Sequence, residues 1–361
     1  MIKTLVALAF VFAGVARAQT TVVYKSGTEG YHTFRIPSVV ATPKGTLLAF
    51  AEARLKSSSD NGDIDTVLKR STDGGATWEK MQLIHDAGPD CIGNPCAVVD
   101  RKTGRVWLLL MKKPGANSTS DNKRGGGKGP MEMFATYSDD DGVTWAKLAD
   151  VTPQAKKPEW TWIVPGPGVG IQTASGRLVV PCNHRVKGER DDKASVAHVM
   201  YSDDGGQSWK IGGEMDRHTN ESQIVERADG SLMFNARSHA GKNRRAIATS
   251  ADGGLTFGKT TLDDGLLDPT CQASVVRLPD VDGQPKGRLL FANNNSAKRE
   301  KMTVRLSTDG GASWPKTLLL HEGPSAYSCL VALPGDRAGC LYETGKYEQI
   351  VFTRFGVAEL K

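Results

Sequence analysis

The sequence lacks the features that mark membrane-spanning, metal-binding or nucleic-acid-binding proteins. After residue 18, no apolar stretch approaches the roughly 20 residues that a transmembrane helix needs. No histidines or cysteines show metal-ligand spacing, and no dense run of lysine and arginine is interleaved with aromatic residues. No segment has convincing helical amphipathic spacing. We therefore expect no metal, no other cofactor, no nucleic-acid partner, no membrane span and little helix.

Glycine and proline are abundant instead. The 361 residues include 40 glycines and 17 prolines, and only 39% of the residues are apolar. This composition is typical of many short strands joined by turns. The formal net charge of +6 is mild, so it predicts a solvated surface that is compatible with an anionic substrate. We expect a monomer.

The N-terminus has the pattern of an export signal. Lys3 precedes an apolar run, and the tripeptide Ala-Arg-Ala at residues 16–18 has the small-x-small form of a signal-peptidase site. We therefore predict a signal peptide over residues 1–18 and a single mature domain over residues 19–361. The protein should be secreted or periplasmic. An exported chain can form disulfides, but the sequence fixes no pairing among its six cysteines, and buried thiols are the alternative.

One short motif, Ser-x-Asp-x-Gly-x-Ser/Thr-aromatic, occurs five times. In each copy the Asp carboxylate can accept backbone N–H groups and the Gly can adopt a left-handed conformation, so each copy predicts a turn between two strands. Successive copies begin 48 to 67 residues apart, which fits about four short strands per repeat. We interpret their aspartates as fold determinants. The five boxes are residues 71–78, 138–145, 202–209, 250–257 and 307–314.

Strand-like runs recur once per repeat, and most of them follow a turn that ends in Gly. Six such runs and five boxes predict an all-β fold, a six-bladed β-propeller of four-stranded antiparallel blades in which one blade lacks a box. The low-complexity segment 115–129 is interpreted as a mobile surface loop. The six runs, expected to be inner strands, are residues 38–50, 105–111, 177–181, 231–235, 288–292 and 340–342.

A propeller brings loops from distant repeats to one central pocket. Arg35 stands in a Phe-Arg-Ile-Pro sequence at the start of the first of these runs, Arg237 lies just after the fourth, and Arg299 follows the fifth. Three converging guanidinium groups would hold a carboxylate through charge-assisted hydrogen bonds. The matched positions therefore favour an anion site over three separate surface arginines.

Phe-Arg-Ile-Pro followed by five boxes resembles the bacterial sialidases, retaining exo-glycosidases of the β-propeller fold that remove terminal sialic acid. The resemblance spans about residues 23–355. It implies hydrolysis of terminal α-ketosidically linked sialic acids on glycoproteins, glycolipids or oligosaccharides, with retention through a covalent tyrosyl intermediate. Three alternatives stay open: a trans-sialidase, an enzyme that cuts a related ulosonic acid, and a sialoglycan-binding propeller without turnover.

The resemblance also implies the roles of individual residues. Arg35, Arg237 and Arg299 would grip the sialic acid carboxylate, and Tyr327, in a Ser-x-Tyr-Ser context, would be the nucleophile. A neutral tyrosine suits an anomeric carbon that already bears a carboxylate, because a second anion would be repelled. Sialidases are the tyrosine exception among glycosidases.

A tyrosine with an ordinary pKa near 10 needs a base. The resemblance implies Glu221, sixteen residues before Arg237, with Glu226 as the nearby rival. The general acid would be an aspartate that follows an Ala-Glu-x-Arg segment ending in Arg54, itself a further substrate-binding arginine. Asp60 is at the expected offset, and Asp63 and Asp65 compete with it.

Four other residues are candidates for supporting roles. Glu343 resembles the carboxylate that orients the first arginine of the triad, and a plain surface glutamate is its alternative. Asn94, Trp160 and Trp162 are candidate substrate contacts, although both tryptophans could equally pack between blades.

Overall fold

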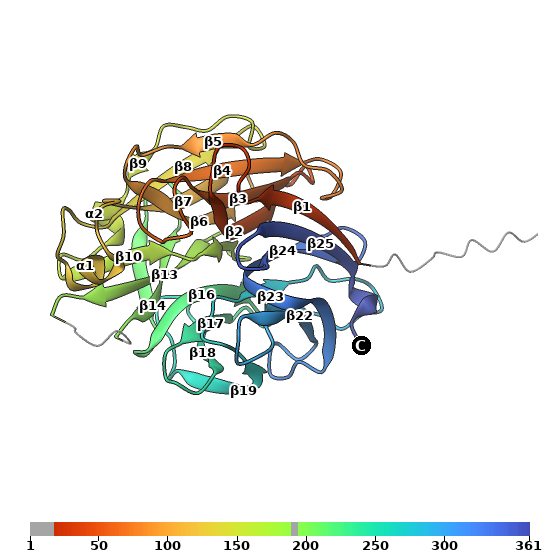
Figure 1. Cartoon of the computed structure of the whole chain (residues 1–361). Helices are drawn as coiled ribbons and strands as arrows, with labels where there is room; N and C mark the ends of the chain where they lie inside the picture. Colours follow the sequence, from red (N-terminus) through yellow and green to blue (C-terminus); the bar gives the residue numbers. More distant parts are fainter. Residues whose placement is uncertain (1–17, 189–193) are drawn as a thin grey trace, which may run out of the picture.

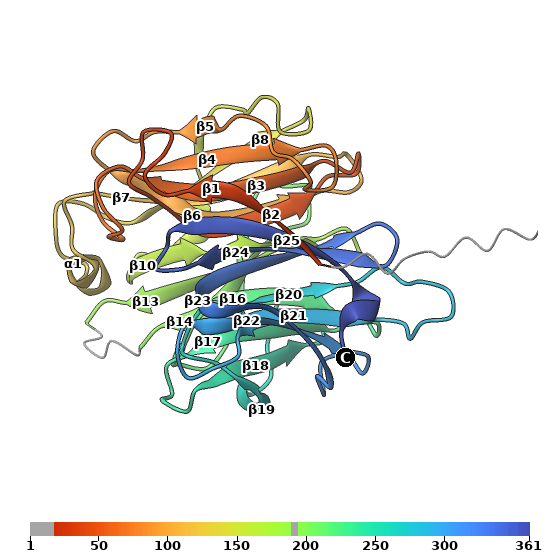
Figure 2. The same cartoon turned by 45° about the vertical axis from the view of Figure 1, so that its right-hand side comes forward.

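The computed structural model describes residues 18–188 and 194–361. Nearly all of the predicted signal peptide lies outside these residues. Within the described residues, antiparallel strands dominate, gathered in sheets around a common centre (Figures 1 and 2), so the predicted all-β class is confirmed. None of the helices in this part of the chain is long and apolar enough to cross a membrane. The short helical elements are α1 (Thr119–Arg124), α2 (Thr152–Ala155) and the 3₁₀ turn η1 (Val357–Glu359).

The strands pair in successive runs of four. The first run and the second run join into one sheet because Ile64 pairs with Cys91 in parallel. The first run contains β2 (Thr33–Ala41), β3 (Leu47–Arg54), β4 (Ile64–Ser71) and β5 (Gln82–His85). The second contains β6 (Cys91–Val99), β7 (Val106–Lys113), β8 (Glu132–Ser138) and β9 (Ala149–Asp150).

The third run has an interrupted first strand, and the fourth run is regular. In the third run, β10 and β12 both pair with β13, while β11 pairs with β6 of the preceding run. Its strands are β10 (Trp160–Pro165), β11 (Gly168–Val169), β12 (Ile171–Gln172), β13 (Leu178–Val186), β14 (Val196–Ser202) and β15 (Lys210–Glu214). The fourth run contains β16 (Thr219–Glu226), β17 (Leu232–Ser238), β18 (Arg244–Ser250) and β19 (Thr261–Leu267).

The two ends of the chain meet in the last run. The long strand β23 first pairs with β22 and then, from Ser325 onward, with β24. The N-terminal strand β1 pairs with β25, so the red and blue ends of the ribbon lie side by side in Figure 1. The fifth run contains β20 (Ser274–Arg277), β21 (Leu289–Asn294), β22 (Glu300–Ser307) and the first part of β23 (Lys316–Leu333). The sixth and last run contains the rest of β23, β24 (Arg337–Thr344), β25 (Gln349–Gly356) and β1 (Gln19–Lys25).

The central strands are not the ones that the sequence pattern indicated. Strands β2, β6, β11, β12, β16, β20 and β23 supply the side chains around the central hollow. The sequence segments that were expected to be inner strands mostly form the second strand of each group of four, namely β7, β13, β17, β21 and β24. The physical reason is that the glycine turns mark the hairpin between the first and second strands, so the pattern identifies the strand after the turn.

Each of the five boxes joins the third strand of a run to the fourth. In the first box, the Asp73 carboxylate accepts the backbone N–H groups of Ala76 at 2.9 Å and Thr77 at 3.0 Å, and also the Thr77 hydroxyl. The Thr144 hydroxyl and neighbouring N–H groups likewise lower the pKa of Asp140 to about 2. The box carboxylates thus accept hydrogen bonds from groups of their own turns. The last run has no box because its third and fourth strands, β25 and β1, come from opposite ends of the chain.

The first box also fastens the first run to the last. The Trp78 ring packs edge-on against Phe352 of β25, with ring centroids 5.4 Å apart. Gly75 has a φ of +86°, and a Cβ there would lie 2.3 Å from the Phe352 ring. Only glycine combines this left-handed backbone with so close an approach.

The segment 115–129, expected to be a mobile surface loop, contains helix α1. The Ser118 side chain accepts the backbone N–H of Asp121, while Asp121 accepts from the Ser118 backbone, which is a capping box. Gly125 ends the helix with a φ of +71°. Thr161 of β10 donates to the carbonyl of Lys123 at 2.8 Å, so the helix is anchored to the third run.

Candidate active site

Tyr327 of β23 lies among acidic and basic side chains from several runs. Its hydroxyl donates to Glu221 Oε1 and accepts a hydrogen bond of 3.3 Å from Arg237 Nη1. The same Arg237 nitrogen pairs with Glu221 Oε2 at 2.8 Å. Tyr327 is only 6% exposed, and burial together with the Glu221 carboxylate raises its pKa well above the ordinary value. The phenol therefore keeps its proton until a base removes it.

The three predicted arginines surround this tyrosine. Arg35 and Arg299 place their Cζ atoms 5.1 Å and 5.6 Å from the centre of the Tyr327 ring, and Arg237 contacts its hydroxyl. Their strand positions are not equivalent, contrary to expectation: Arg35 lies on β2, Arg237 on β17, and Arg299 in the turn between β21 and β22. Their convergence comes from the tertiary arrangement and not from one repeated position.

Glu343 of β24 ties Arg35 to the strand that carries Tyr327. Its carboxylate accepts from Arg35 Nε at 3.1 Å and Nη2 at 3.3 Å. It also accepts the backbone N–H groups of Ile36 at 2.9 Å and Tyr327 at 3.0 Å. Ile36 has a φ of +60°, and the pairing of β2 with β3 is irregular there. This local bulge turns Arg35 toward Glu343.

Asp60 lies between β3 and β4 and is paired with two arginines. Its Oδ1 is 2.8 Å from Arg54 Nη1 and 3.3 Å from Arg35 Nη1, although the side chain is 63% exposed. Arg54 is also paired with Glu52 at 2.6 Å. Burial alone would raise the pKa of Asp60, but Arg54 and Arg35 outweigh it and hold that pKa below the ordinary value.

The rival aspartates do not reach this cluster. Asp65 is buried on β4 and accepts the Tyr31 hydroxyl at 2.6 Å. Burial and the neighbouring carboxylates of Asp86 and Asp63 raise its pKa to about 6, even though Tyr31 opposes the shift. Asp65 thus has a raised pKa but lies apart from the cluster around Tyr327. Neither Asp63 nor Asp65 lines the hollow beside Tyr327.

A hollow of about 80 Å³ lies beside Tyr327. Trp162 lines it, with its indole N–H bound to Asn183 at 3.0 Å, and so does Asn94. Trp160 does not line the hollow: it is buried and stacked on His184, with ring centroids 3.7 Å apart. The lining residues are Ile36, Glu52, Arg54, Asp60, Asn94, Met111, Lys113, Thr119, Trp162, Val164, Asn220, Glu221 and Tyr327.

Several of these residues had no place in the sequence-based site. Lys113, at the end of β7, is buried and donates from Nζ to the Asp60 carbonyl at 2.6 Å and to Asn61 Oδ1 at 3.0 Å. Thr119 of α1 reaches the hollow from the segment expected to be mobile. The Ser-x-x-Asp capping box at residues 118–121 was the available signal for Thr119, whereas no motif pointed to Lys113.

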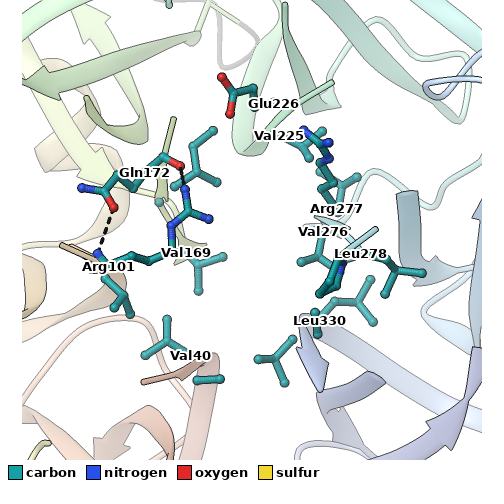
Figure 3. A pocket seen from close by; sticks show the side chains of 18 of the residues that line it. Val40, Arg101, Val169, Gln172, Val225, Glu226, Val276, Arg277, Leu278 and Leu330 are labelled. Carbon is teal, nitrogen blue, oxygen red and sulfur yellow. Dashed lines mark hydrogen bonds between the residues drawn. The ribbon is translucent and has the colours of Figure 1, made fainter. Parts of the chain in front are cut away.

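A second hollow, of about 520 Å³, lies at the opposite ends of the same central strands. Figure 3 shows aliphatic side chains such as Val40, Val276 and Leu330 around it, with Glu226 at its margin. Glu226 accepts the backbone N–H of Ala174 at 2.9 Å. Glu226 thus lies apart from Tyr327, at a hollow whose lining is mainly aliphatic but also includes Arg101, Arg277 and Asp280.

Comparison with known proteins shows the family of this chain. The family described as BNR repeat-like domain matches residues 45–340. A sialidase of Bacteroides fragilis is 35% identical over 350 residues, which cover 92% of this chain and 63% of that protein. An exo-alpha-sialidase of Aspergillus fumigatus is 32% identical over 367 residues, which cover 91% of this chain and 85% of that protein.

Among solved structures, the Hadza microbial sialidase Hz136 superposes with a TM-score of 0.84 at 32% identity, covering 93% of this chain and 68% of that one. Such sialidase structures are β-propellers. This chain is a repeat-built β protein, and it belongs to the sialidase family, whose members are glycoside hydrolases. It spans less than two thirds of the Bacteroides fragilis relative.

Proposed function

We propose that the protein is an exo-α-sialidase that hydrolyses terminal α-ketosidically linked sialic acids on glycoproteins, glycolipids or oligosaccharides, with retention. One observation carries the proposal: three arginines surround Tyr327, and the Tyr327 hydroxyl is hydrogen-bonded to Glu221. The arginines suit a carboxylate, and the tyrosine–glutamate pair suits attack on the carbon that bears it.

The three arginines would bind the substrate carboxylate next to the anomeric carbon. Arg35 is oriented by Glu343 at 3.1 Å, and Arg237 by Glu221 at 2.8 Å. Bidentate guanidinium groups would fix both the position and the direction of the carboxylate. Orientation of the anomeric carbon over Tyr327 follows from this anchoring.

The reaction would run as two displacements. Tyr327 Oη forms a bond to the anomeric carbon as the bond from that carbon to the glycosidic oxygen breaks, while Glu221 takes the phenol proton and Asp60 protonates the departing oxygen. A water molecule then gives a proton to Asp60, and the oxygen of this water attacks the anomeric carbon. Tyr327 leaves and regains its proton from Glu221. Two inversions give net retention.

Asp60 must hold a proton before it can act as the acid. In the structure its carboxylate is paired with Arg35 at 3.3 Å, one of the arginines assigned here to the substrate carboxylate. A substrate carboxylate on Arg35 would displace Asp60 and then lie near it, and both changes raise the pKa of an aspartate. The 80 Å³ hollow is smaller than the roughly 300 Å³ of a typical small-molecule site, which supports an outward movement of the exposed Asp60.

The same proposal extends to architecture and location. We infer six blades of four strands, closed by β1 beside β25, because the central hollow is lined by six successive segments, one from each run. We propose that residues 1–18 direct export and are then removed, which lowers the net charge from +6 by the two positive charges of Lys3 and Arg17. A single mature domain that acts as a secreted or periplasmic monomer is the expected product.

Turnover of a fluorogenic α-sialoside tests the activity. The purified protein should release the fluorophore, and Tyr327→Phe should lose about 10³-fold or more of kcat. Tyr342→Phe is the matched control, because its hydroxyl bonds to Thr353 outside the site. No turnover by the unaltered protein would overturn the enzyme proposal. NMR identifies the anomer of sialic acid that is released first. Initial release of the β anomer would overturn retention.

A further inference from the structure

Tyr347 contacts two of the three arginines around Tyr327. Its ring centroid lies 4.0 Å from the Arg35 Cζ atom, closer than the 5.1 Å between that atom and the Tyr327 ring. Its hydroxyl accepts a hydrogen bond of 3.0 Å from Arg299 Nη1. One side chain thus binds Arg35 through its π face and Arg299 through its oxygen.

The backbone holds Tyr347 in this place from several sides. It lies in the turn between β24 and β25, with a φ of +66°, a left-handed conformation that non-glycine residues seldom adopt. Its carbonyl accepts from the Ser26 hydroxyl at 2.7 Å, and the Ser26 backbone N–H donates to Glu348 at 2.9 Å. The turn is therefore fastened to the segment that leads into β2, the strand of Arg35.

The charges around the arginines explain why an uncharged partner is useful. Glu343 pairs with Arg35, and Glu221 pairs with Arg237. Among the ion pairs between described residues, none involves Arg299. A carboxylate at that place would compete with a carboxylate ligand for Arg299. The phenol oxygen and ring of Tyr347 stabilise two cations without adding a negative charge.

We propose that Tyr347 is a positioning residue that holds Arg35 and Arg299 in the geometry that binds the substrate carboxylate. The inference rests on the proposed sialidase function and adds a further residue to its binding site. Tyr347 acts through the two arginines and has no part in the proton transfers. Its loss should therefore weaken binding more than it slows the chemical steps.

Two substitutions separate the two contacts. Tyr347→Phe removes the hydrogen bond to Arg299 and keeps the ring over Arg35, and should raise KM about fivefold to tenfold with kcat within about twofold. Tyr347→Leu removes both contacts and should raise KM about 30-fold or more. Tyr342→Phe, on the same hairpin, deletes a phenol hydroxyl that bonds to Thr353 and should leave both parameters unchanged.

A double-mutant cycle provides a readout that a merely structural role would not move. The probe is 2-deoxy-2,3-didehydro-N-acetylneuraminic acid, and its Ki is measured for the unaltered protein, Tyr347→Phe, Arg299→Ala and the double variant. Because the hydroxyl acts through Arg299, Tyr347→Phe should weaken binding of the probe about fivefold to tenfold in the otherwise unaltered protein. In the Arg299→Ala protein the same substitution should weaken binding by less than twofold.

The positioning role would be overturned if Tyr347→Phe weakened binding of the probe equally with and without Arg299, or if it did not weaken binding when Arg299 is present. In either case the unaltered protein would still bind the probe and cleave the sialoside, so the proposed function would stand. An unaltered protein that neither binds the probe nor cleaves a sialoside would overturn the proposed function and this inference with it. Tyr347→Phe preserves the ring and the backbone, so the test stands even where Tyr347→Leu fails to fold.

Discussion

The two ends of the central strands form two very different hollows. The end near Tyr327 encloses about 80 Å³, with Asp60, Glu221 and other charged side chains in its lining. The opposite end encloses about 520 Å³ and is lined mainly by aliphatic side chains, with Arg101, Glu226 and Arg277 at its margin (Figure 3). Under the proposed function the smaller hollow is the reactive end, because Asp60, Glu221 and Tyr327 meet there, so the kind of groups that meet matters more than the volume that they enclose.

Strand geometry explains how one set of strands builds both ends. On β16, Glu221 lies near the first residue and Glu226 is the last, so about five residues at 3.3 Å each separate them along the strand. On β2, Arg35 lies near the start, while Val40 near the end lines the apolar hollow. The two ends of one strand thus contribute residues to two different hollows.

The largest expected effect separates the two glutamates of β16. Glu221→Gln removes the proposed base beside the Tyr327 hydroxyl and should lower kcat by about 10³-fold. Glu226→Gln makes the same chemical change at the other end, where the side chain accepts the backbone N–H of Ala174 at 2.9 Å, and should leave kcat within about twofold. Steady-state kinetics with a fluorogenic α-sialoside measures both.

The comparison would break if Glu226→Gln were as damaging as Glu221→Gln. Circular dichroism and the thermal midpoint of each variant exclude unfolding as the cause of lost activity. A Glu221→Gln variant with full activity would remove Glu221 from the mechanism, whatever the result for Glu226.

Much of the scaffold could be predicted from the sequence because turns are local. In each of the five boxes an aspartate stands two residues after a serine. Its carboxylate accepts hydrogen bonds from groups no more than four residues away, as Asp73 does from Thr77. The identity of the central strands could not be predicted, because it depends on how the runs pack around one another. The turn signal therefore pointed one strand too far along the chain.

Short motifs in the sequence pointed to two residues of the candidate site. Arg35 and Tyr327 stand in recognisable contexts, and the structure brings both together with Arg237 and Arg299. Contacts between distant segments left no such signal. Tyr347 reaches Arg35 across 312 residues of sequence, and no local pattern encodes that approach.

The next effect concerns the ion pair that links Asp60 to the arginines. Because Arg54 and Arg35 hold the pKa of Asp60 below its ordinary value, Asp60 is charged in the unbound protein above that pKa. A carboxylate ligand that takes Arg35 should raise the pKa, so binding at pH 5 should be accompanied by proton uptake. The affinity for the ligand should consequently weaken as the pH rises.

Asp60→Ala should lower kcat about 10²-fold for sialyl-lactose, whose leaving group needs a proton, and less than tenfold for an activated aryl sialoside, whose leaving group does not.

Calorimetry in buffers of different ionisation enthalpy measures the proton uptake. The unaltered protein should take up a fraction of a proton with 2-deoxy-2,3-didehydro-N-acetylneuraminic acid, and Asp60→Asn should take up none. Uptake that persists in Asp60→Asn would assign the proton to another group. Equal kcat losses for both substrates would argue against Asp60 as the acid.

The smallest effect on activity is expected at the apolar end. Leu330 is 1% exposed and lines the large hollow. Leu330→Ala should lower the free energy of unfolding by about 2 kcal/mol, near the low end for buried leucines, because the side chain already borders open space. The thermal midpoint should fall by about 4 °C, with kcat and KM unchanged, since Tyr327 is three residues nearer the other end of β23. A change in KM without loss of stability would mean that the apolar end is coupled to the site, and the division of this molecule into a reactive and a packing end would then be wrong.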